Sequence, residues 1–351
     1  MTYDASELWA ALDRLVDRAP SLADLRAHRL HFYAAIRWRS LGRPVPPSVE
    51  EEQRVAEVFE IAVPFVLERV REALDGPVLL VKGPEAASFY PQPLVRVYRD
   101  LDLLVSDAKA AQRALLAAGF VEVGDPDIFI DIHHERPLWL PGSPRLAIEL
   151  HSRPKWPERF TAPALDELFA TAVQSATGVP GLQAASAAHH ALLLAAHSWS
   201  HVPLGRLLDL VDVAMVSDGV KRAEMAKIAR SWGVERIWRT TIGACDALFF
   251  GGEATWALRG WAWNLADARE RSVFGSHVQA WLSPFSALPP AAAVRASGRA
   301  LLGELEPGEG ETWDDKLRRT RLAIRNAFVR RSEHAEQLGP AAHRRRRRPR
   351  A

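Results

Sequence analysis

The segment VRVYRDLDLLV, residues 95–105, places two carboxylates in a run that otherwise has the composition of a buried strand. Successive side chains of a strand point to opposite faces of the sheet, so Asp100 and Asp102 share one face and the leucines that follow each of them share the other. Two carboxylates this close repel each other, and one of them stays protonated unless a cation lies nearby. The segment therefore predicts a strand that holds a divalent metal ion on one face.

The flanking sequence supplies further groups suited to phosphate chemistry. Residues 77–83, PVLLVKG, predict a short strand and a turn in which Gly83 lets the backbone approach an anion and Lys82 adds a positive charge. Farther on, Glu149 and His151 alternate with apolar residues in LAIELH, so Glu149 can join the aspartate pair from a neighbouring strand. Mg²⁺ prefers such oxygen ligands together with substrate phosphates, and three carboxylates are compatible with a two-metal site for in-line displacement at phosphorus.

With these motifs the chain resembles a bacterial family of poorly characterised nucleotidyltransferases within the DNA-polymerase-beta-like superfamily. The resemblance rests on LLVKGPEAASFYPQPLVRVYRDLDLLV, GFVEV and LAIELHSRP, and it extends over about residues 55–220. It implies a small mixed β-sheet core with helices, of the α+β or α/β class. It also implies Mg²⁺ or Mn²⁺ as cofactor, and transfer of a nucleoside monophosphate from a nucleoside triphosphate to an unidentified acceptor with release of pyrophosphate. The family motifs fall on Lys82, Gly83, Tyr90, Pro91, Arg96, Asp100, Asp102, Glu149 and His151.

Each of these positions has an expected role. The three acids are predicted to hold the metal ions, and Glu149 also to help deprotonate the acceptor hydroxyl. Lys82 and the backbone of Gly83 are expected to bind the triphosphate, and Arg96 to stabilise the charge that develops on the leaving pyrophosphate. For His151 a substrate contact, the orientation of a carboxylate and a structural hydrogen bond all stay open.

Two other functions compete with nucleotidyl transfer. In the superfamily a serine usually follows the glycine, whereas Pro84 follows Gly83 here, which removes a hydroxyl and one backbone N–H donor. This departure favours a non-catalytic nucleotide-binding or scaffold protein as the main alternative. A helical metal-dependent phosphohydrolase is a further one, because His197 and His201 are four residues apart and lie on one face of a predicted helix. The adjacent His-Asp dipeptide of such enzymes is missing.

Composition indicates an ordinary globular protein of 351 residues, with 48% hydrophobic and 25% charged residues. The formal net charge is +2, and removing the six arginines of residues 344–350 leaves −4, so weak polyanion contact is expected only through the Arg344–Arg350 tail. A single cysteine and the absence of a secretory signal at the start predict a cytoplasmic protein. No apolar run is long enough to predict a membrane span, and the sequence leaves the oligomeric state open.

Periodicity divides the chain into five parts. Helical patterns dominate the beginning, strands alternate with helices in the middle, and strand signals are absent after the middle part. His133 and His134 fall in a predicted hairpin of the middle part and are interpreted as structural. The predicted parts are a helical region at 1–75, the nucleotidyltransferase core at 76–156, a helical domain at 157–302, a linker and basic helix at 303–335, and a disordered arginine-rich tail at 336–351.

Overall fold

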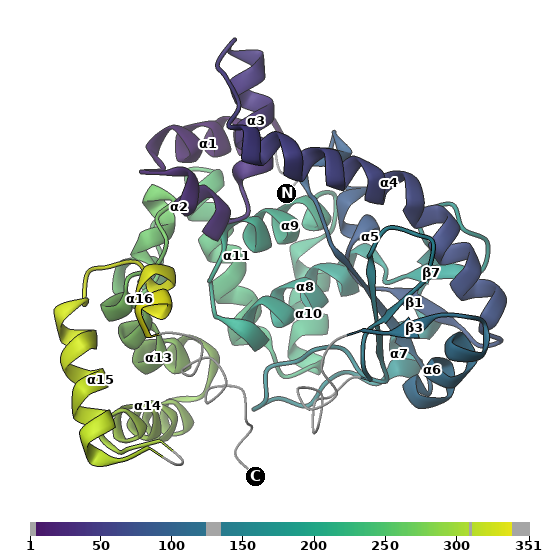
Figure 1. The fold of residues 1–351 in the computed structure, drawn as a ribbon. Coiled ribbons are helices and arrows are strands. Elements are labelled where there is room, and N and C mark those ends of the chain that lie inside the picture. Colours follow the sequence, from purple (N-terminus) through teal and green to yellow (C-terminus); the bar gives the residue numbers. More distant parts are fainter. Residues whose placement is uncertain (1–4, 124–134, 309–310, 339–351) are drawn as a thin grey trace.

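The computed structural model describes residues 5–123, 135–308 and 311–338. Figure 1 shows a mixed sheet on one side of the molecule, a group of helices beside it, and a further group of helices on the far side. This arrangement confirms the predicted α+β core with helices, and helical segments come before and after the core in the chain.

The predicted helical beginning of the chain is confirmed. Apolar residues three and four apart bury one side of the first helix, which places Leu8, Leu12 and Leu15 in the core. The fourth helix is the longest of the four and crosses the sheet region (Figure 1). The four helices are α1 (Ala5–Arg18), α2 (Leu22–Ala27), α3 (His31–Ser40) and α4 (Pro47–Ala73).

The sheet has seven strands in the order β3-β4-β5-β2-β1-β7-β6. The predicted central strand, β2, lies between β1, which is antiparallel to it, and β5, which is parallel to it. β7 runs parallel to β1 on the other side, and the remaining pairs are antiparallel. The strands are β1 (Val78–Leu80), β2 (Asp100–Val105), β3 (Val121–Glu122), β4 (Leu138–Trp139), β5 (Ala147–His151), β6 (Val173–Gln174) and β7 (Leu182–Ala184).

The prediction that no strand follows the middle part of the chain is wrong, because β6 and β7 belong to the same sheet. These strands have two and three residues, too few for an alternating pattern to be recognised. β7 is nevertheless central to the fold, since it pairs with β1 over residues 182–184. The part of the predicted hairpin at residues 127–134, with His133 and His134, lies outside the described residues, as does the tail at 344–350.

Helices cover both faces of the sheet and form two apolar cores. One core contains Leu101 and Leu103 of β2 together with residues of α4 and α6. The other contains Leu104 of β2 and extends through α8, α9 and α11. Asp102 shares the face of Leu104, so the carboxylates of β2 point towards the face of the sheet that α8, α9 and α11 cover.

The helices of the middle and end of the chain complete the structure. Of the described helices, none combines the length and the apolar character that crossing a membrane requires. They are α5 (Pro84–Ala87), η1 (Pro93–Val95), α6 (Ala108–Ala117), α7 (Leu165–Ala170), α8 (Ala187–His201), α9 (Leu207–Ser217), α10 (Arg222–Ser231), α11 (Glu235–Phe249), α12 (Trp256–Gly260), η3 (Trp263–Asp267), α13 (Val273–Ala287), α14 (Pro290–Leu305), α15 (Trp313–Arg325) and α16 (Arg331–Leu338).

Candidate active site

Two neighbouring strands bring an acidic and histidine cluster together. The parallel register of β2 and β5 places Asp102 directly beside Glu149, and His151 follows one pleat farther along the same face. One side-chain atom from each of these three residues lies within 4.8 Å of the others. Two carboxylates and an imidazole at this separation are compatible with a divalent metal ion.

Lys155 is a member of this cluster that the sequence reasoning missed. Its Nζ lies 2.7 Å from Glu149 Oε2 and 3.7 Å from Asp102 Oδ1. It follows β5 in a loop, where residues have no periodic pattern that would assign them to a face, so only its closeness to LAIELH could have suggested a role. The side chains of Asp102 and Glu149 are therefore bridged by a cation that the protein itself supplies.

Hydrogen bonds within the cluster decide the charges of its members. His151 Nε2 lies 3.1 Å from Asp102 Oδ1 and 3.5 Å from Glu149 Oε2. Burial alone would raise the pKa of Asp102, but the hydrogen bond from His151 and the charges of nearby lysines outweigh it and lower that pKa. In the same way the pKa of Glu149 falls to about 2. Burial opposes protonation of His151, yet its hydrogen bonds to the two carboxylates raise its pKa above the usual range.

Asp100 lies at the start of β2, beside the cluster but outside the group of three. Burial and the neighbouring charge of Asp102 raise the pKa of Asp100. Asp102 and Asp100 therefore differ in the direction of their pKa shifts, as repulsion between two adjacent carboxylates requires.

The predicted phosphate-binding turn lies next to Asp100. Gly83 has φ +65°, and a side chain at this position would place its Cβ 3.0 Å from the carbonyl oxygen of Asp100. The adjacent Lys82 is half-buried, and burial lowers its pKa, while the charge of Asp102 acts against that shift. The structure thus brings Lys82 and Gly83 together with the aspartates of β2, where β1 ends and β2 begins.

Arg96 occupies a buried network instead of an open position. It is 5% exposed, and its guanidinium donates to both carboxylate oxygens of Asp212 on α9, with the shortest contact at 2.9 Å. Tyr90 Oη donates to the same carboxylate at 2.6 Å. Binding of phosphate by Arg96 stays a prediction, and the contacts described here instead join the η1 segment to α9.

The histidine pair of α8 belongs to the same region. His197 Nε2 and His201 Nε2 are 3.1 Å apart, as expected for positions four residues apart on a helix. Burial and the positive charge of Lys82 hold the pKa of His197 well below its usual range, while the charge of Asp102 opposes this shift. Among the described residues, the cluster that could hold a metal through three ligands consists of Asp102, Glu149 and His151 and does not include this pair.

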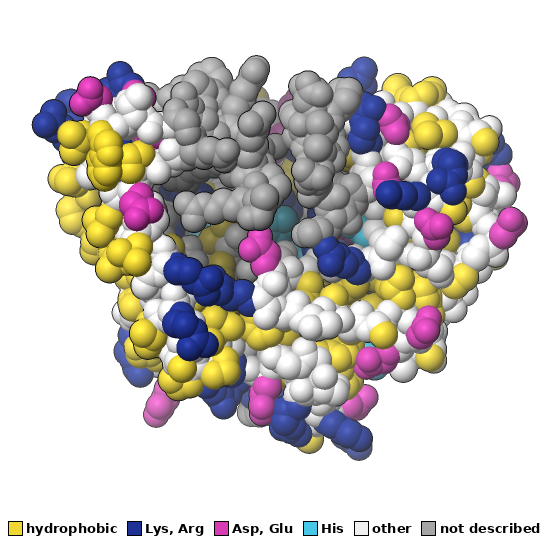
Figure 2. Space-filling view, turned by 90° about the horizontal axis from the view of Figure 1, so that it is seen from below, with side chains coloured by type: hydrophobic (Ala, Val, Ile, Leu, Met, Phe, Trp, Pro, Cys, Tyr) yellow, Lys and Arg dark blue, Asp and Glu magenta, His cyan; other side chains and the backbone are white. Residues whose placement is uncertain are grey.

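A large cavity lies beside His201 of this pair. It has a volume of about 580 Å³ and is lined by His201 together with residues of α13, α14, α15 and α16, among them Phe274, Trp281 and Ile324. Seen from below, the surface is hollowed between the two sides of the molecule, and histidine side chains are visible inside the hollow (Figure 2). The cavity therefore lies between His201 and the helices at the end of the chain.

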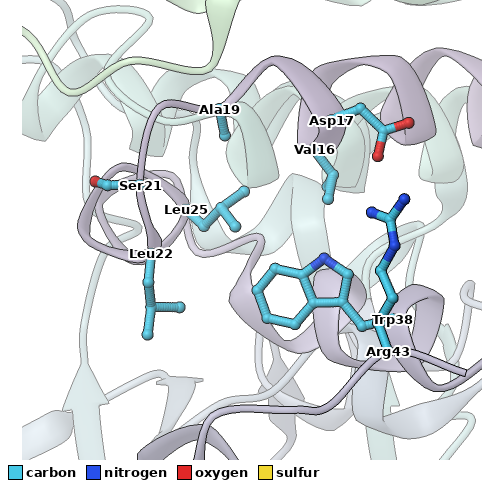
Figure 3. Close-up of a pocket in the computed structure, with 8 residues that line it drawn as sticks. All are labelled: Val16, Asp17, Ala19, Ser21, Leu22, Leu25, Trp38 and Arg43. Carbon is cyan, nitrogen blue, oxygen red and sulfur yellow. The ribbon is translucent and has the colours of Figure 1, made fainter.

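A separate cavity of about 420 Å³ lies among the first three helices (Figure 3). The Trp38 ring and Leu25 line it, and Asp17 and Arg43 lie at one end. Asp17 pairs with Arg37, as a structural contact between α1 and α3. Neither the acid cluster nor the histidine pair of α8 lines this cavity, so it does not form part of the candidate active site.

The fold and the site together define a nucleotidyltransferase α+β core with an acidic and histidine cluster on its central strands. The sequence model of the family described as uncharacterised nucleotidyltransferase matches residues 18–250. The chain belongs to this family, which confirms the resemblance stated from its motifs. No curated protein and no solved structure matches the chain.

Proposed function

We propose that this protein transfers a nucleoside monophosphate from a nucleoside triphosphate to an acceptor and releases pyrophosphate. The observation that carries the proposal is the direct pairing of Asp102 with Glu149 on adjacent parallel strands, with His151 beside them. The family supports nucleotide as the substrate class.

The side chains of the cluster have distinct roles in this proposal. Asp102 and Glu149 would hold the divalent ion, Mg²⁺ or Mn²⁺, and Asp100 would join them as a further ligand. Such an ion would stabilise the charge that develops on the transferring phosphoryl group. Glu149 would help deprotonate the acceptor hydroxyl; its pKa of about 2 keeps it ionised at neutral pH but also makes it a weak base, so it acts together with the ion. His151 donates a hydrogen bond to Asp102 and fixes the orientation of that carboxylate.

The acceptor binds, in this proposal, in the 580 Å³ cavity that begins at His201. Its wall is mainly apolar around Phe274, Trp281 and Ile324. Pockets of this size with a few polar groups are typical sites for small molecules. The supporting observation is that His201 lines the cavity while its partner His197 lies within the influence of the charge of Asp102.

Label transfer tests the proposed activity. The protein is incubated with each α-labelled nucleoside triphosphate and Mg²⁺ or Mn²⁺, and pyrophosphate release is measured in parallel. We expect Asp102→Asn to lower the rate by a factor of about 100 or more, because removing one electrostatic contact to a transition state costs about 10²–10³ in rate. Asp75→Asn, which changes an exposed acid after α4, is the control and keeps full activity. Equal rates for Asp102→Asn and the unchanged protein contradict the proposal.

A non-catalytic nucleotide-binding protein is the second candidate. Two observations favour it: Pro84 follows Gly83, and Lys155 and His151 already compensate the carboxylates of the cluster. This candidate predicts nucleotide binding without pyrophosphate release for any acceptor. The phosphohydrolase candidate predicts instead that His197→Ala removes metal and activity whereas Asp102→Asn does not.

Three sequence-based expectations accompany the proposal. The division of the chain into five parts, the cytoplasmic location and the weak polyanion contact through Arg344–Arg350 stay predictions. Limited proteolysis, which cuts first between parts that fold separately, tests the division.

A further inference from the structure

The turn that was expected to bind the triphosphate offers few donors. α5 has only four residues, and Pro84 at its first position has no backbone N–H. The positive φ of Gly83 has a packing reason, since a Cβ there would meet the carbonyl oxygen of Asp100. Arg96 is already engaged by Asp212. A triphosphate carries several negative charges, so its binding requires cations beyond Lys82.

Two exposed arginines next to this region have no partner for their charge. Arg29 lies between α2 and α3, and Arg206 is the N-cap residue of α9. Neither makes an ion pair or a side-chain hydrogen bond with any residue that the structure describes. Arg54 and Arg69 of α4 differ in this respect, because each pairs with a nearby glutamate.

The backbone holds the two arginines side by side. His28 accepts the N–H of Leu207 at its Nδ1 and the N–H of Leu208 at its carbonyl oxygen, both at 3.3 Å. His28 Nε2 donates to the carbonyl oxygen of Arg269 at 2.7 Å. The first two hydrogen bonds fix the residue before Arg29 against the residues after Arg206, and the third fixes His28 itself.

Arg29 also has an unusual backbone conformation. Its φ is +58°, in the left-handed region that few residues other than glycine occupy. Arg29 has this conformation because it follows the end of α2: its N–H donates to the carbonyl oxygen of Arg26, and the N–H of Leu30 donates to that of Leu25, the usual hydrogen bonds of a helix C-terminus. The left-handed residue therefore sets the path of the chain from α2 to α3.

Both arginines lie close to the start of β2. Glu52 pairs with His31, two residues after Arg29, and lies 3.6 Å from Arg99, which precedes Asp100. Arg206 precedes the first turn of α9, on which Asp209 and Asp212, three residues apart, lie on one side. Asp212 reaches Arg96 and Tyr90 at the sheet, so this side of α9 points towards β2. Arg29 is open to solvent on one side but has protein around it on the others, and this surrounding protein lowers its pKa, as does the charge of Arg206. The charges of Asp209 and Asp100 oppose this shift.

We propose that Arg29 and Arg206 bind the terminal phosphates of the nucleoside triphosphate. This inference rests on the proposed function and identifies how the donor is distinguished from a nucleoside monophosphate. A guanidinium binds phosphate through two parallel hydrogen bonds, and the polyanion relieves the repulsion between the two cations. The pair supplies the charge that the Gly83-Pro84 turn lacks.

The test compares the affinities for triphosphate and monophosphate. Isothermal titration with Mg²⁺ gives the dissociation constants of ATP, GTP, CTP and UTP and of the corresponding monophosphates. The variant Arg29→Asn, Arg206→Gln removes both guanidinium groups, and asparagine tolerates the left-handed backbone at position 29. We expect the affinity for the best-bound triphosphate to fall by about tenfold for each arginine, as for the loss of a hydrogen bond to a charged group, and the affinity for its monophosphate to stay the same.

Controls separate this inference from the proposed function. Arg113→Gln changes an exposed arginine of α6, on the opposite side of the sheet, and keeps the ratio of the two affinities. Arg206→Lys recovers part of the loss because it retains the charge. If the unchanged protein prefers a triphosphate and the double variant keeps that preference, the assignment of the arginines is wrong while the proposed function stands. If the unchanged protein binds no triphosphate, both are wrong.

Discussion

Asp102 and Glu149 lie close together because two cations of the protein compensate them. His151 donates to Asp102, and Lys155 pairs with Glu149 at 2.7 Å. Asp102 is 5% exposed, so its charge without such partners would carry a large desolvation cost. A divalent ion that binds the same carboxylates competes with Lys155 and with the proton of His151. The cluster can thus be neutralised either by its own cations or by a metal ion.

Replacing Lys155 by methionine makes the stability of the protein depend on a divalent ion. We expect the free energy of unfolding in EDTA to fall by about 1–3 kcal/mol, as for other buried charged groups that lose a partner. Mn²⁺ restores most of this loss, because an ion that binds only the folded state stabilises it. Urea unfolding with EDTA and with Mn²⁺ measures both values.

The control for this variant is Lys109→Met, which changes an exposed lysine of α6. It leaves the response to Mn²⁺ as in the unchanged protein. An equal loss of stability for Lys155→Met in EDTA and in Mn²⁺ would show that the carboxylates do not bind the ion.

The pair of Arg96 and Asp212 predicts a cost in stability when one partner is removed. Both side chains are almost fully buried, at 6% and 4% exposure. We expect Arg96→Met to destabilise the protein by about 3–5 kcal/mol, because the carboxylate of Asp212 stays buried without its cation. The double variant Arg96→Met, Asp212→Leu recovers part of that loss, which urea unfolding of the single and double variants measures.

The same double variant tests the role of Arg96 in substrate binding. If Arg96 only joins η1 to α9, the folded double variant binds the triphosphate as the unchanged protein does. A decrease in affinity of more than about tenfold, or 1.4 kcal/mol, would instead support the predicted phosphate contact.

The secondary structure around the site could be predicted where the sequence pattern was long enough. β2 has six residues and β5 five, so their alternation was sufficient to place Asp102 and Glu149 on one face. β6 and β7 have two and three residues and gave no such signal. Lys155 was missed because it lies in a loop, whose path depends on tertiary contacts. Contacts between distant segments, such as His28 with α9, have no local signature in one sequence.

The turn between β1 and α5 predicts that position 83 accepts only glycine. Gly83 has φ +65° and ψ −125°, and an added Cβ would lie 3.0 Å from the backbone oxygen of Asp100. We expect Gly83→Ala to lower the free energy of unfolding by about 1–3 kcal/mol through backbone strain, with a further loss from the contact with Asp100. The urea midpoint measures the change, and Gly76→Ala, which meets no atom within 4 Å, is the matched control. Equal midpoints for the two variants would contradict this reading of the turn.

Two buried histidines connect the parts of the molecule that surround the site. His28 joins the N-terminal helices to α9 and to the backbone at Arg269. His190 of α8 is hydrogen bonded through Nε2 to the carbonyl oxygen of Val81, next to β1, at 2.6 Å. The first contact holds Arg29 beside α9, and the second holds α8 against the sheet. Both depend on imidazoles that are neutral at pH 7, because burial lowers the pKa of each to about 4 in spite of these hydrogen bonds.

The molecule as a whole is therefore expected to lose stability in mild acid. Between pH 6.5 and about 4 the two histidines bind protons in the unfolded chain and not in the folded one, so the free energy of unfolding falls as the pH is lowered. Each histidine contributes up to about 3 kcal/mol to the loss of stability between these two pH values, at 1.36 kcal/mol for each pKa unit. Above pH 6.5 neither histidine makes the stability depend on pH. Urea unfolding in EDTA at pH 7.5, 6, 5 and 4.5 measures the slope for the unchanged protein and for His28→Gln, which retains a side-chain donor for the Arg269 carbonyl. We expect a shallower slope of the free energy of unfolding against pH in the variant, because the unfolded chain binds up to one proton fewer. An identical slope in both proteins would mean that His28 is not neutral in the folded state.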